Sequence, residues 1–224
     1  MARWTPERRD TIRALADELL QNYSRGRVLV GIDGADGAGK TVFADDLATD
    51  LRSLGHEVFR ASMDDFHQAR AARYAKGRDS ADGFYEDSFD YSAFRRVLLG
   101  PFRMAGSTGF QLRFFDLKRD VPFDADWTTG PADAFLIVDG LFLQRPELAG
   151  IWNFSVWIDA PDEVRRQRMI ARDGSHPEFD EPRGQRYLLA QERYQREVSP
   201  RAAASAIIDN TDYDHPRRLF ADSC

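Results

Sequence analysis

The sequence contains little of what marks several large classes of protein. Its 224 residues include one cysteine, Cys224, which excludes a disulfide framework and a cysteine metal site. No stretch is apolar for long enough to span a bilayer, and the first residues lack the apolar core of a signal peptide. These absences predict a cytoplasmic protein that does not bind membranes.

Charge and repetition are limited as well. The 31 Lys and Arg residues against 37 Asp and Glu residues give a net charge of −6, which argues against non-specific binding of nucleic acid. No long block of one charge sign, internal repeat, low-complexity segment or linker divides the chain. We therefore expect residues 1–224 to form a single α/β domain with a substantial core.

A glycine-rich segment carries the most information. Residues 34–41 fit the phosphate-loop pattern G-x-x-x-x-G-K-[ST], whose fixed positions are held by Gly34, Gly39, Lys40 and Thr41. Glycines let backbone N–H groups turn toward phosphate oxygens, the lysine reaches the terminal phosphates, and the threonine hydroxyl ligates Mg²⁺. The chain is therefore predicted to bind a nucleoside triphosphate. The expected contacts are Gly34, Ala35, Asp36, Gly37, Ala38, Gly39, Lys40, Thr41 and Val42.

Strand-like runs alternate with helical patterns along the chain. The strand candidates are residues 27–32, 57–63, 134–141, 154–160 and 204–209. Near-continuous apolar runs of this kind indicate a parallel five-stranded sheet covered on both faces, a three-layer α/β/α fold. An opening amphipathic helix is expected over residues 5–22, with Thr5 as its N-cap and Pro6 in the first helical position.

Three of the strand candidates end in an acid, at Asp64, Asp139 and Asp159. Ligands of parallel sheets sit beyond the carboxyl ends of the strands, so these side chains are candidates for chemistry. Asp64 could accept a proton from a substrate hydroxyl or help to hold Mg²⁺, and a helix-capping role is the alternative. Asp139 has the general form of a second magnesium-binding motif, although many buried strands end in Asp-Gly turns.

A helix is expected over residues 162–174. Arg165, Arg168 and Arg172 share one of its faces, where three guanidinium groups repel one another unless acids or phosphates neutralise them. Such a face suits a clamp on a transferring phosphoryl group, whose charge spreads over its oxygens. The alternative is a solvated face that pairs with neighbouring acids.

Residues 65–133 differ from the rest of the chain in being rich in charges, glycines and aromatic residues. We interpret them as an insertion on the carboxyl side of the sheet, with a helix near residues 91–99 and a short extended pair within residues 110–117. The run of basic residues at 70–78 is either a charged lip or a solvated loop. The aromatic and acidic residues at 84–91 suit a sugar or nucleoside. His67 and His176 receive no role.

In combination, these segments resemble the uridine/cytidine kinase and phosphoribulokinase group of P-loop kinases, over about residues 25–212. The resemblance rests on residues 34–41, 62–66, 89–90, 138–140, 165–173 and 206–210. It implies a P-loop NTPase-type fold, the use of ATP and Mg²⁺, and a lid at about residues 162–186. Further implied roles are Asp64, Lys40, Arg168 and Arg172 in catalysis, Arg165 in ATP binding, Thr41, Asp64 and Asp139 around Mg²⁺, and Asp90 and Phe115 in acceptor binding.

Departures from the family pattern concern the acceptor. His67 follows Phe66 where uridine kinases usually have tyrosine, and Asp120 falls near the place of the family's pyrimidine-reading histidine. The sequence thus predicts an ATP-dependent kinase that phosphorylates a hydroxyl of a small metabolite, with a nucleoside such as uridine first. Alternatives are another sugar-like or pantothenate-like alcohol, or a nucleotide-dependent switch, against which no guanine-reading or transporter-ATPase motif is found. The sequence leaves open whether the chain forms a homo-oligomer.

Overall fold

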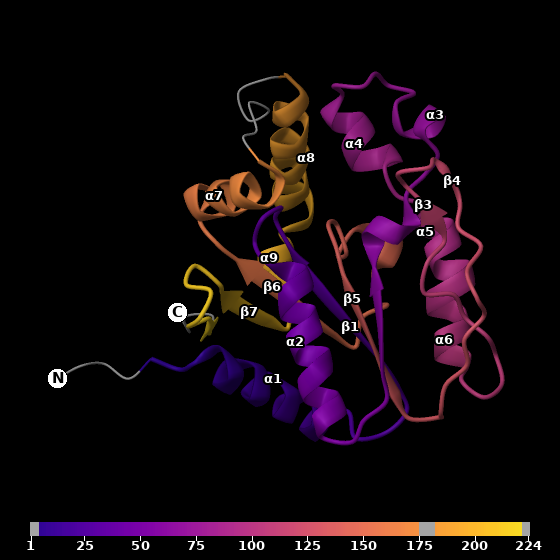
Figure 1. Ribbon diagram of the computed structural model, residues 1–224, viewed down its shortest axis with the longest axis vertical. Coiled ribbons are helices and arrows are strands. Elements are labelled where there is room, and N and C mark those ends of the chain that lie inside the picture. Colours follow the sequence, from indigo (N-terminus) through magenta and orange to yellow (C-terminus); the bar gives the residue numbers. More distant parts are fainter. Residues whose placement is uncertain (1–4, 175–181, 221–224) are drawn as a thin grey trace.

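The computed structural model describes residues 5–174 and 182–220, and its centre is a six-stranded sheet with the order β2-β5-β1-β6-β7-β8 (Figure 1). The strands are β1 (Arg27–Gly34), β2 (Val58–Ser62), β5 (Ala134–Asp139), β6 (Phe154–Asp159), β7 (Ala206–Asp209) and β8 (Arg217–Leu219). The first five pair in parallel, which confirms the expected sheet. β8 adds an antiparallel edge that was not expected. Its short, charged sequence gives no apolar run, as is common for edge strands.

Helices cover both faces of the sheet, and the strands alternate between two cores. On β5, Phe135 and Ile137 pack with α1 (Arg8–Asn22) and α2 (Lys40–Ser53). Leu136 and Val138 face the opposite core, which is rich in aromatic residues from the insertion. This period of two buries both faces of a strand that reads as one apolar run. The three-layer α/β/α architecture is therefore confirmed.

The first helix begins later than the sequence suggested. Its N-cap is Glu7 rather than Thr5, so the prediction that Pro6 holds the first helical position was wrong. The backbone N–H of Glu7 donates to the Asp10 carboxylate at 3.2 Å. Glu7 and Asp10 thus form a reciprocal cap, which replaces the single hydroxyl cap expected at Thr5.

The insertion is mostly helical. It contains η1 (Met63–Phe66), α3 (Arg70–Arg73), α4 (Ala81–Asp87), α5 (Tyr91–Ala93), η2 (Phe94–Leu99), α6 (Gly100–Met104), β3 (Phe115–Asp116) and β4 (Val121–Pro122). The helix expected near residues 91–99 begins at its predicted place and continues through a π-helical segment into α6. β3 lies within residues 110–117, but its antiparallel partner is β4, beyond that range.

The helices α7 (Asp162–Asp173), α8 (Pro182–Val198) and α9 (Pro200–Ala203) lie between β6 and β7 in the chain. The short η3 (Pro146–Leu148) lies between β5 and β6. α7 matches the helix expected over residues 162–174. α8 packs along α4, so this helix closes against the insertion above the sheet (Figure 1). No helix in the described part of the chain is long and apolar enough to cross a membrane.

Candidate active site

The phosphate loop connects β1 to α2, as the motif requires. Two of its glycines, Gly37 and Gly39, have φ angles of +74° and +96°, which residues with a Cβ rarely adopt. A Cβ on Gly37 would lie 2.6 Å from the backbone oxygen of Arg165, and one on Gly39 would lie 2.6 Å from Nδ2 of Asn210. The loop thus needs glycine for its turn and for the close approach of its neighbours.

Lys40 and Thr41 open α2 directly beyond this loop. The Lys40 side chain is buried, and its Nζ donates to the carbonyl of Ala35 at 2.9 Å, which holds the ammonium group over the loop. Thr41 Oγ1 donates to Oδ2 of Asp139 at 2.6 Å. The other carboxylate oxygen of Asp139 accepts from Arg60 Nη2 at 2.9 Å. The structure therefore brings the predicted pair Thr41 and Asp139 together.

These oxygen donors fit Mg²⁺. The ion usually binds one or two carboxylates together with substrate phosphates and waters, so a sparse set of protein oxygens suffices. Thr41 and Asp139 provide a hydroxyl and a buried carboxylate in direct contact. Within residues 5–174 and 182–220 no group of three or more His, Cys, Asp or Glu residues could hold a metal by itself. A metal ion held by Thr41 and Asp139 would be completed by phosphate oxygens and waters, as is usual for Mg²⁺.

Asp64 lies on η1, just beyond the end of β2, and its side chain faces a large cavity. Asp64 is exposed toward this space, and the protein around the cavity reduces the hydration of its carboxyl, which raises its pKa to about 6. The Lys40 ammonium group opposes the shift, whereas the carboxylates of Asp36 and Asp139 add to it. A carboxyl group with this pKa is ionised at neutral pH but holds a proton more readily than an ordinary aspartate.

The cavity measures about 1060 Å³ and joins the phosphate loop to the insertion. Asp36 of the loop and Asp64 both line it. Its other walls come from α7, α8 and the segments around α3 and α4 (Figure 1). Its lining includes Arg70, Arg73, Tyr74, Arg78, Phe84, Phe89, Arg165, Arg172, Arg186, Tyr187 and Gln191. Donor-side and acceptor-side groups therefore share one space.

The predicted arginine face of α7 divides between two places. Arg165 and Arg172 line the cavity, and Arg165 Nη1 donates to the carbonyl of Asp36 in the loop at 3.0 Å. Arg168 is not among the lining residues; its Nη2 donates to the carbonyl of Asn210 at 2.8 Å. Its catalytic role stays a prediction. Of the expected lid, residues 175–181 lie outside the described residues, as does His176.

The two predicted acceptor contacts lie elsewhere. Asp90 Oδ1 accepts from the backbone N–H of Ala93 at 2.8 Å and caps α5, and it does not line the cavity. Phe115 is buried on β3 and is also absent from the lining. Asp90 therefore satisfies a helix end. Contact of either residue with an acceptor stays a prediction.

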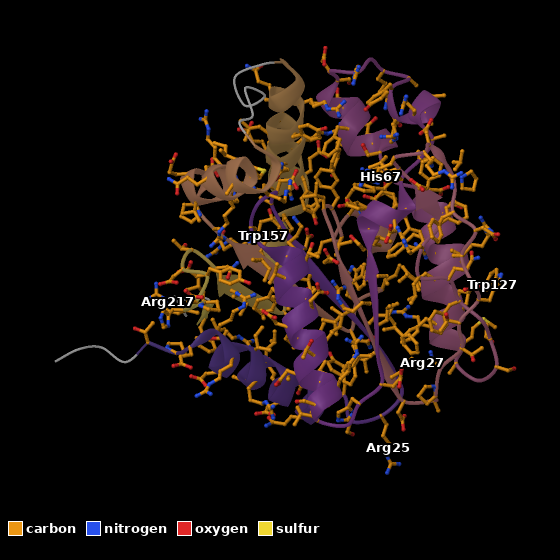
Figure 2. All side chains as sticks on the ribbon, viewed as in Figure 1. Arg25, Arg27, His67, Trp127, Trp157 and Arg217 are labelled. Carbon is orange, nitrogen blue, oxygen red and sulfur yellow. The ribbon has the colours of Figure 1, made fainter. Side chains whose placement is uncertain are left out.

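Several lining residues were missed or left without a role. His67, near α4 and α5 in Figure 2, packs 4.6 Å from the ring of Phe89, and its Nδ1 lies 2.7 Å from the carbonyl of Asp64. Burial lowers the pKa of His67 to about 4, so the ring is neutral at physiological pH. Arg186, Tyr187 and Gln191 come from α8. The expected lid at about residues 162–186 reached only the beginning of this helix, and none of the three residues was named as a contact.

α8 also contacts the base of the phosphate loop. Gln191 Oε1 accepts from the backbone N–H of Asp36 at 3.0 Å. The hydroxyl of Tyr194 donates to the buried carboxylate of Asp33 on β1 and accepts from the backbone N–H of Gln144 at 2.9 Å. Desolvation raises the pKa of Asp33 to about 6, although the hydrogen bond from Tyr194 opposes the shift. The helix that walls the cavity is thus hydrogen-bonded to the donor loop.

Comparison with known proteins finds distant relatives in sequence. No family model matches the chain. It is 22% identical over 146 residues to a uridine kinase of Lactobacillus helveticus, covering 65% of this chain and 67% of that one. It is 23% identical over 161 residues to a uridine kinase of Streptococcus pyogenes, covering 65% and 68%.

Solved structures give the same result. A possible uridine kinase from Bacillus stearothermophilus superposes with a TM-score of 0.71 at 27% identity, over 91% of this chain and 98% of that one. A putative fructose transport system kinase from Silicibacter shares the fold, with a TM-score of 0.62 at 24% identity over 87% and 95%. With the loop, Thr41 and Asp139 in their expected geometry, these likenesses lead to one conclusion: the chain has the fold of the P-loop kinases and is similar in sequence and structure to uridine kinases.

Proposed function

We propose that this chain transfers the γ-phosphoryl group of ATP to a hydroxyl group of a small metabolite, with Asp64 as the general base. The observation that carries the proposal is the shared cavity. Asp64, with its pKa raised to about 6, faces the same space as Asp36 of the phosphate loop and Arg165 of α7. A hydroxyl held near Asp64 would thus lie on the side from which a phosphoryl group at the loop can be attacked.

On the donor side, the loop N–H groups and the Lys40 ammonium group would bind the phosphates. Lys40 would exchange its bond to the Ala35 carbonyl for phosphate oxygens, a change that keeps its charge at the loop. Thr41 and Asp139 would hold Mg²⁺, which when bound offsets charge on the phosphate oxygens. Arg165 and Arg172 face the cavity from α7, where they would neutralise the equatorial oxygens of the transferring group.

On the acceptor side, Asp64 would orient the hydroxyl and take its proton as the oxygen attacks phosphorus. The O–H bond of the acceptor breaks, its oxygen forms the new bond to phosphorus, and the proton passes to the Asp64 carboxylate. A pKa of about 6 suits this step because the group is largely ionised at pH 7 and still basic enough to hold the proton.

The acceptor is less constrained than the donor. The curated relatives are named uridine kinases, which makes uridine the first acceptor to test. The neutral His67 ring beside Phe89 supplies an aromatic wall of the cavity, on which a planar or sugar-like group can pack. Other small alcohols fit this description too, so the acceptor panel must be broad.

The test compares Asp64→Asn with Asp65→Asn, its neighbour. Asp65 pairs with Arg113 at 3.1 Å and is not among the lining residues, so it serves as a matched control. With an active acceptor, Asp64→Asn should lower kcat by about 10²–10⁴-fold because the proton loses its acceptor, while the ATP dissociation constant changes little. Asp65→Asn should keep most of the turnover.

ADP release is the measurement, made with and without nucleosides, sugars and vitamin-like alcohols. A kinase releases ADP much faster when its alcohol is present. Full turnover in Asp64→Asn would contradict the role of that residue. Slow ADP release that no added alcohol changes would contradict the kinase and favour a nucleotide-dependent switch.

A further inference from the structure

Two arginines of α8 lie two turns apart and have contrasting surroundings. Arg193 is paired with three carboxylates: its Nη1 lies 2.7 Å from Asp82 and 2.7 Å from Glu86, and its Nε lies 2.9 Å from Glu197. The charge of Arg193 is therefore neutralised within the fold. Its task is to join α8 to α4, the neighbouring helix of the insertion.

Arg186 has no such compensation among the described residues. Its guanidinium group donates to the backbone carbonyl of Arg78 and to the hydroxyl of Tyr187, and no carboxylate is among its hydrogen-bond partners in residues 5–174 and 182–220. Its Nε is buried without a hydrogen-bond partner in that part of the chain. Burial opposes the charge of Arg186, but hydrogen bonds to the hydroxyl groups of Tyr187 and Tyr74 raise its pKa, so the group stays charged. A hydroxyl oxygen is a weaker partner than an anion, and an anionic ligand would add a charge-assisted hydrogen bond here.

Aromatic rings surround this guanidinium group. Its Cζ lies 5.4 Å from the ring centre of Tyr74, 5.7 Å from that of Phe84 and 4.5 Å from that of Tyr187. All three rings also line the cavity. Rings hold the planar group in a fixed orientation and displace water, so an anion that reaches it is attracted more strongly than at an open surface.

Further positive charge lies on the same wall. Arg70 and Arg78 line the cavity with exposed side chains, and the guanidinium group of Arg78 lies 5.8 Å from the Tyr74 ring. Arg73 lines the same wall, but its charge is offset by Asp120, with which it pairs at 3.2 Å. The carboxylates of the lining lie away from this wall: Asp36 is in the phosphate loop, Asp162 and Glu163 are on α7, and Asp64 is the base of the proposed reaction.

We propose that the acceptor is an alcohol that also carries a phosphate or carboxylate group, and that Arg186, with Arg70 and Arg78 beside it, binds this acidic group while the hydroxyl faces Asp64. This inference rests on the proposed kinase activity and narrows its substrate class. A planar guanidinium group suits both acids because it donates two parallel hydrogen bonds to either. A neutral nucleoside offers no charge to offset three arginines.

The experiment uses matched neutral and acidic alcohols: ribose with ribose 5-phosphate for the phosphate arm, and glycerol with glycerate for the carboxylate arm, with uridine as the nucleoside reference. ADP release gives kcat and KM for each. Binding of ribose 5-phosphate and of glycerate is measured separately by calorimetry, with a non-hydrolysable ATP analogue filling the donor site. The calorimetry reports on acid binding whether or not turnover occurs.

We expect one acidic member to exceed its neutral partner and uridine in kcat/KM by at least about tenfold, the effect of one good charged contact of roughly 1.5–3 kcal/mol. Arg186→Gln should raise KM for that acid about tenfold or more and weaken its binding by a similar factor, with KM for ATP unchanged. Arg186→Lys should show a smaller loss than Arg186→Gln, because lysine keeps the positive charge but cannot donate two parallel hydrogen bonds to the acid. Arg193→Gln should lower thermal stability and leave acceptor KM unchanged.

The outcomes separate the inference from the proposed function. Rapid turnover of uridine or of the neutral members, with no preference for an acid, overturns the inference and leaves the kinase intact. Acid binding that depends on Arg186 without turnover of any alcohol supports Arg186 as an acid-binding residue, but it contradicts the kinase and therefore the role of the acid as its acceptor. The inference is overturned if the acids are neither bound nor turned over. It is also overturned if an acid preference survives in Arg186→Gln.

Discussion

The donor side of the cavity is built mainly from one continuous run of chain, whereas the acceptor side combines side chains from η1, α3, α4 and α8. In the donor loop, backbone conformation sets the geometry, as the positive φ angles of Gly37 and Gly39 show. In the acceptor wall, side chains such as Arg186 and Tyr74 set it. A site made of backbone tolerates few residue types. A wall made of side chains can change its ligand without changing the fold.

The largest expected effect tests the donor side, through Lys40→Met. Removing the ammonium group from the loop should lower kcat/KM by about 10²–10³-fold or more, because the transferring phosphoryl group loses a preorganised positive charge. If donor and acceptor sides are separate in function, the loss should be the same factor for every acceptor. Steady-state kinetics with two unlike acceptors measures this.

Arg186→Gln is the matched comparison on the acceptor side, since its effect should depend on the acceptor. A Lys40→Met loss that varies strongly between acceptors would contradict the division of the cavity into two halves. A folded Lys40→Met variant, checked by circular dichroism, is needed because the side chain is buried.

The pH dependence of turnover tests the base at the boundary between the halves. In the proposed reaction Asp64 is a base in its ionised form, and its pKa of about 6 means that protonation would remove the base below that pH. We expect kcat/KM to fall about tenfold per pH unit below pH 6. His67, with its pKa lowered to about 4, stays neutral through this range and adds nothing to the slope.

Asp33 has the same pKa of about 6 and lies at the base of the loop. The wild-type pH profile alone therefore does not show which of the two carboxyl groups causes the acid limb, the fall in kcat/KM below pH 6. The residual activity of Asp64→Asn does. A flat profile from pH 5 to 7 in this variant assigns the limb to Asp64. An unchanged limb would assign it to Asp33 and contradict the proposed base.

Gly37→Ala probes the contact between the loop and α7. The new Cβ would meet the backbone oxygen of Arg165 at 2.6 Å, at a residue whose φ is +74°. Relieving this clash must move α7 from the loop, so we expect KM for ATP to rise about tenfold and stability to fall by about 1–3 kcal/mol. ATP-dependent kinetics and urea unfolding measure the two effects.

Gly55→Ala is the control, because Gly55 has a φ of +88° and no atom within 4 Å of its added Cβ. It should show the cost of backbone strain without the change in KM for ATP. Equal KM values in the two variants would mean that the contact between Gly37 and Arg165 does not position the nucleotide.

These contrasts explain how much the sequence could predict. The five parallel strands were predicted because each is a short apolar run that a two-sided sheet buries, as in the alternation of Phe135 and Leu136 on β5. The antiparallel β8 was not predicted because its arginines give no such signal. Thr5 was chosen as a cap on residue type alone, whereas Glu7 and Asp10 satisfy two donors together.

The same difference holds for the site. Thr41 and Asp139 were predictable because a motif and a strand end fix their positions, and parallel pairing of β1 with β5 brings them together. Arg186 was not predictable, because its position depends on the packing of α8 along α4, which no local pattern encodes. Asp90 was predicted to bind the acceptor because of the resemblance to a known family. In the structure its carboxylate caps the N-terminus of α5.

Tyr194→Phe removes one of the hydrogen bonds that join the two halves. The Tyr194 hydroxyl on α8 donates to the buried Asp33 carboxylate on β1, so its loss leaves a charged acceptor with one fewer donor. We expect urea unfolding at pH 7 to show a loss of about 1.5–3 kcal/mol. Tyr23→Phe should cost less, because the Tyr23 hydroxyl donates to the Asn153 carbonyl at a solvent-exposed site.

The Tyr194 hydroxyl favours ionised Asp33, whose pKa is about 6, so the Tyr194→Phe loss should shrink at pH 5 as the carboxyl becomes protonated. An equal loss at pH 5 and pH 7 would show that Tyr194 acts by packing, and that α8 and the loop are not joined through charge.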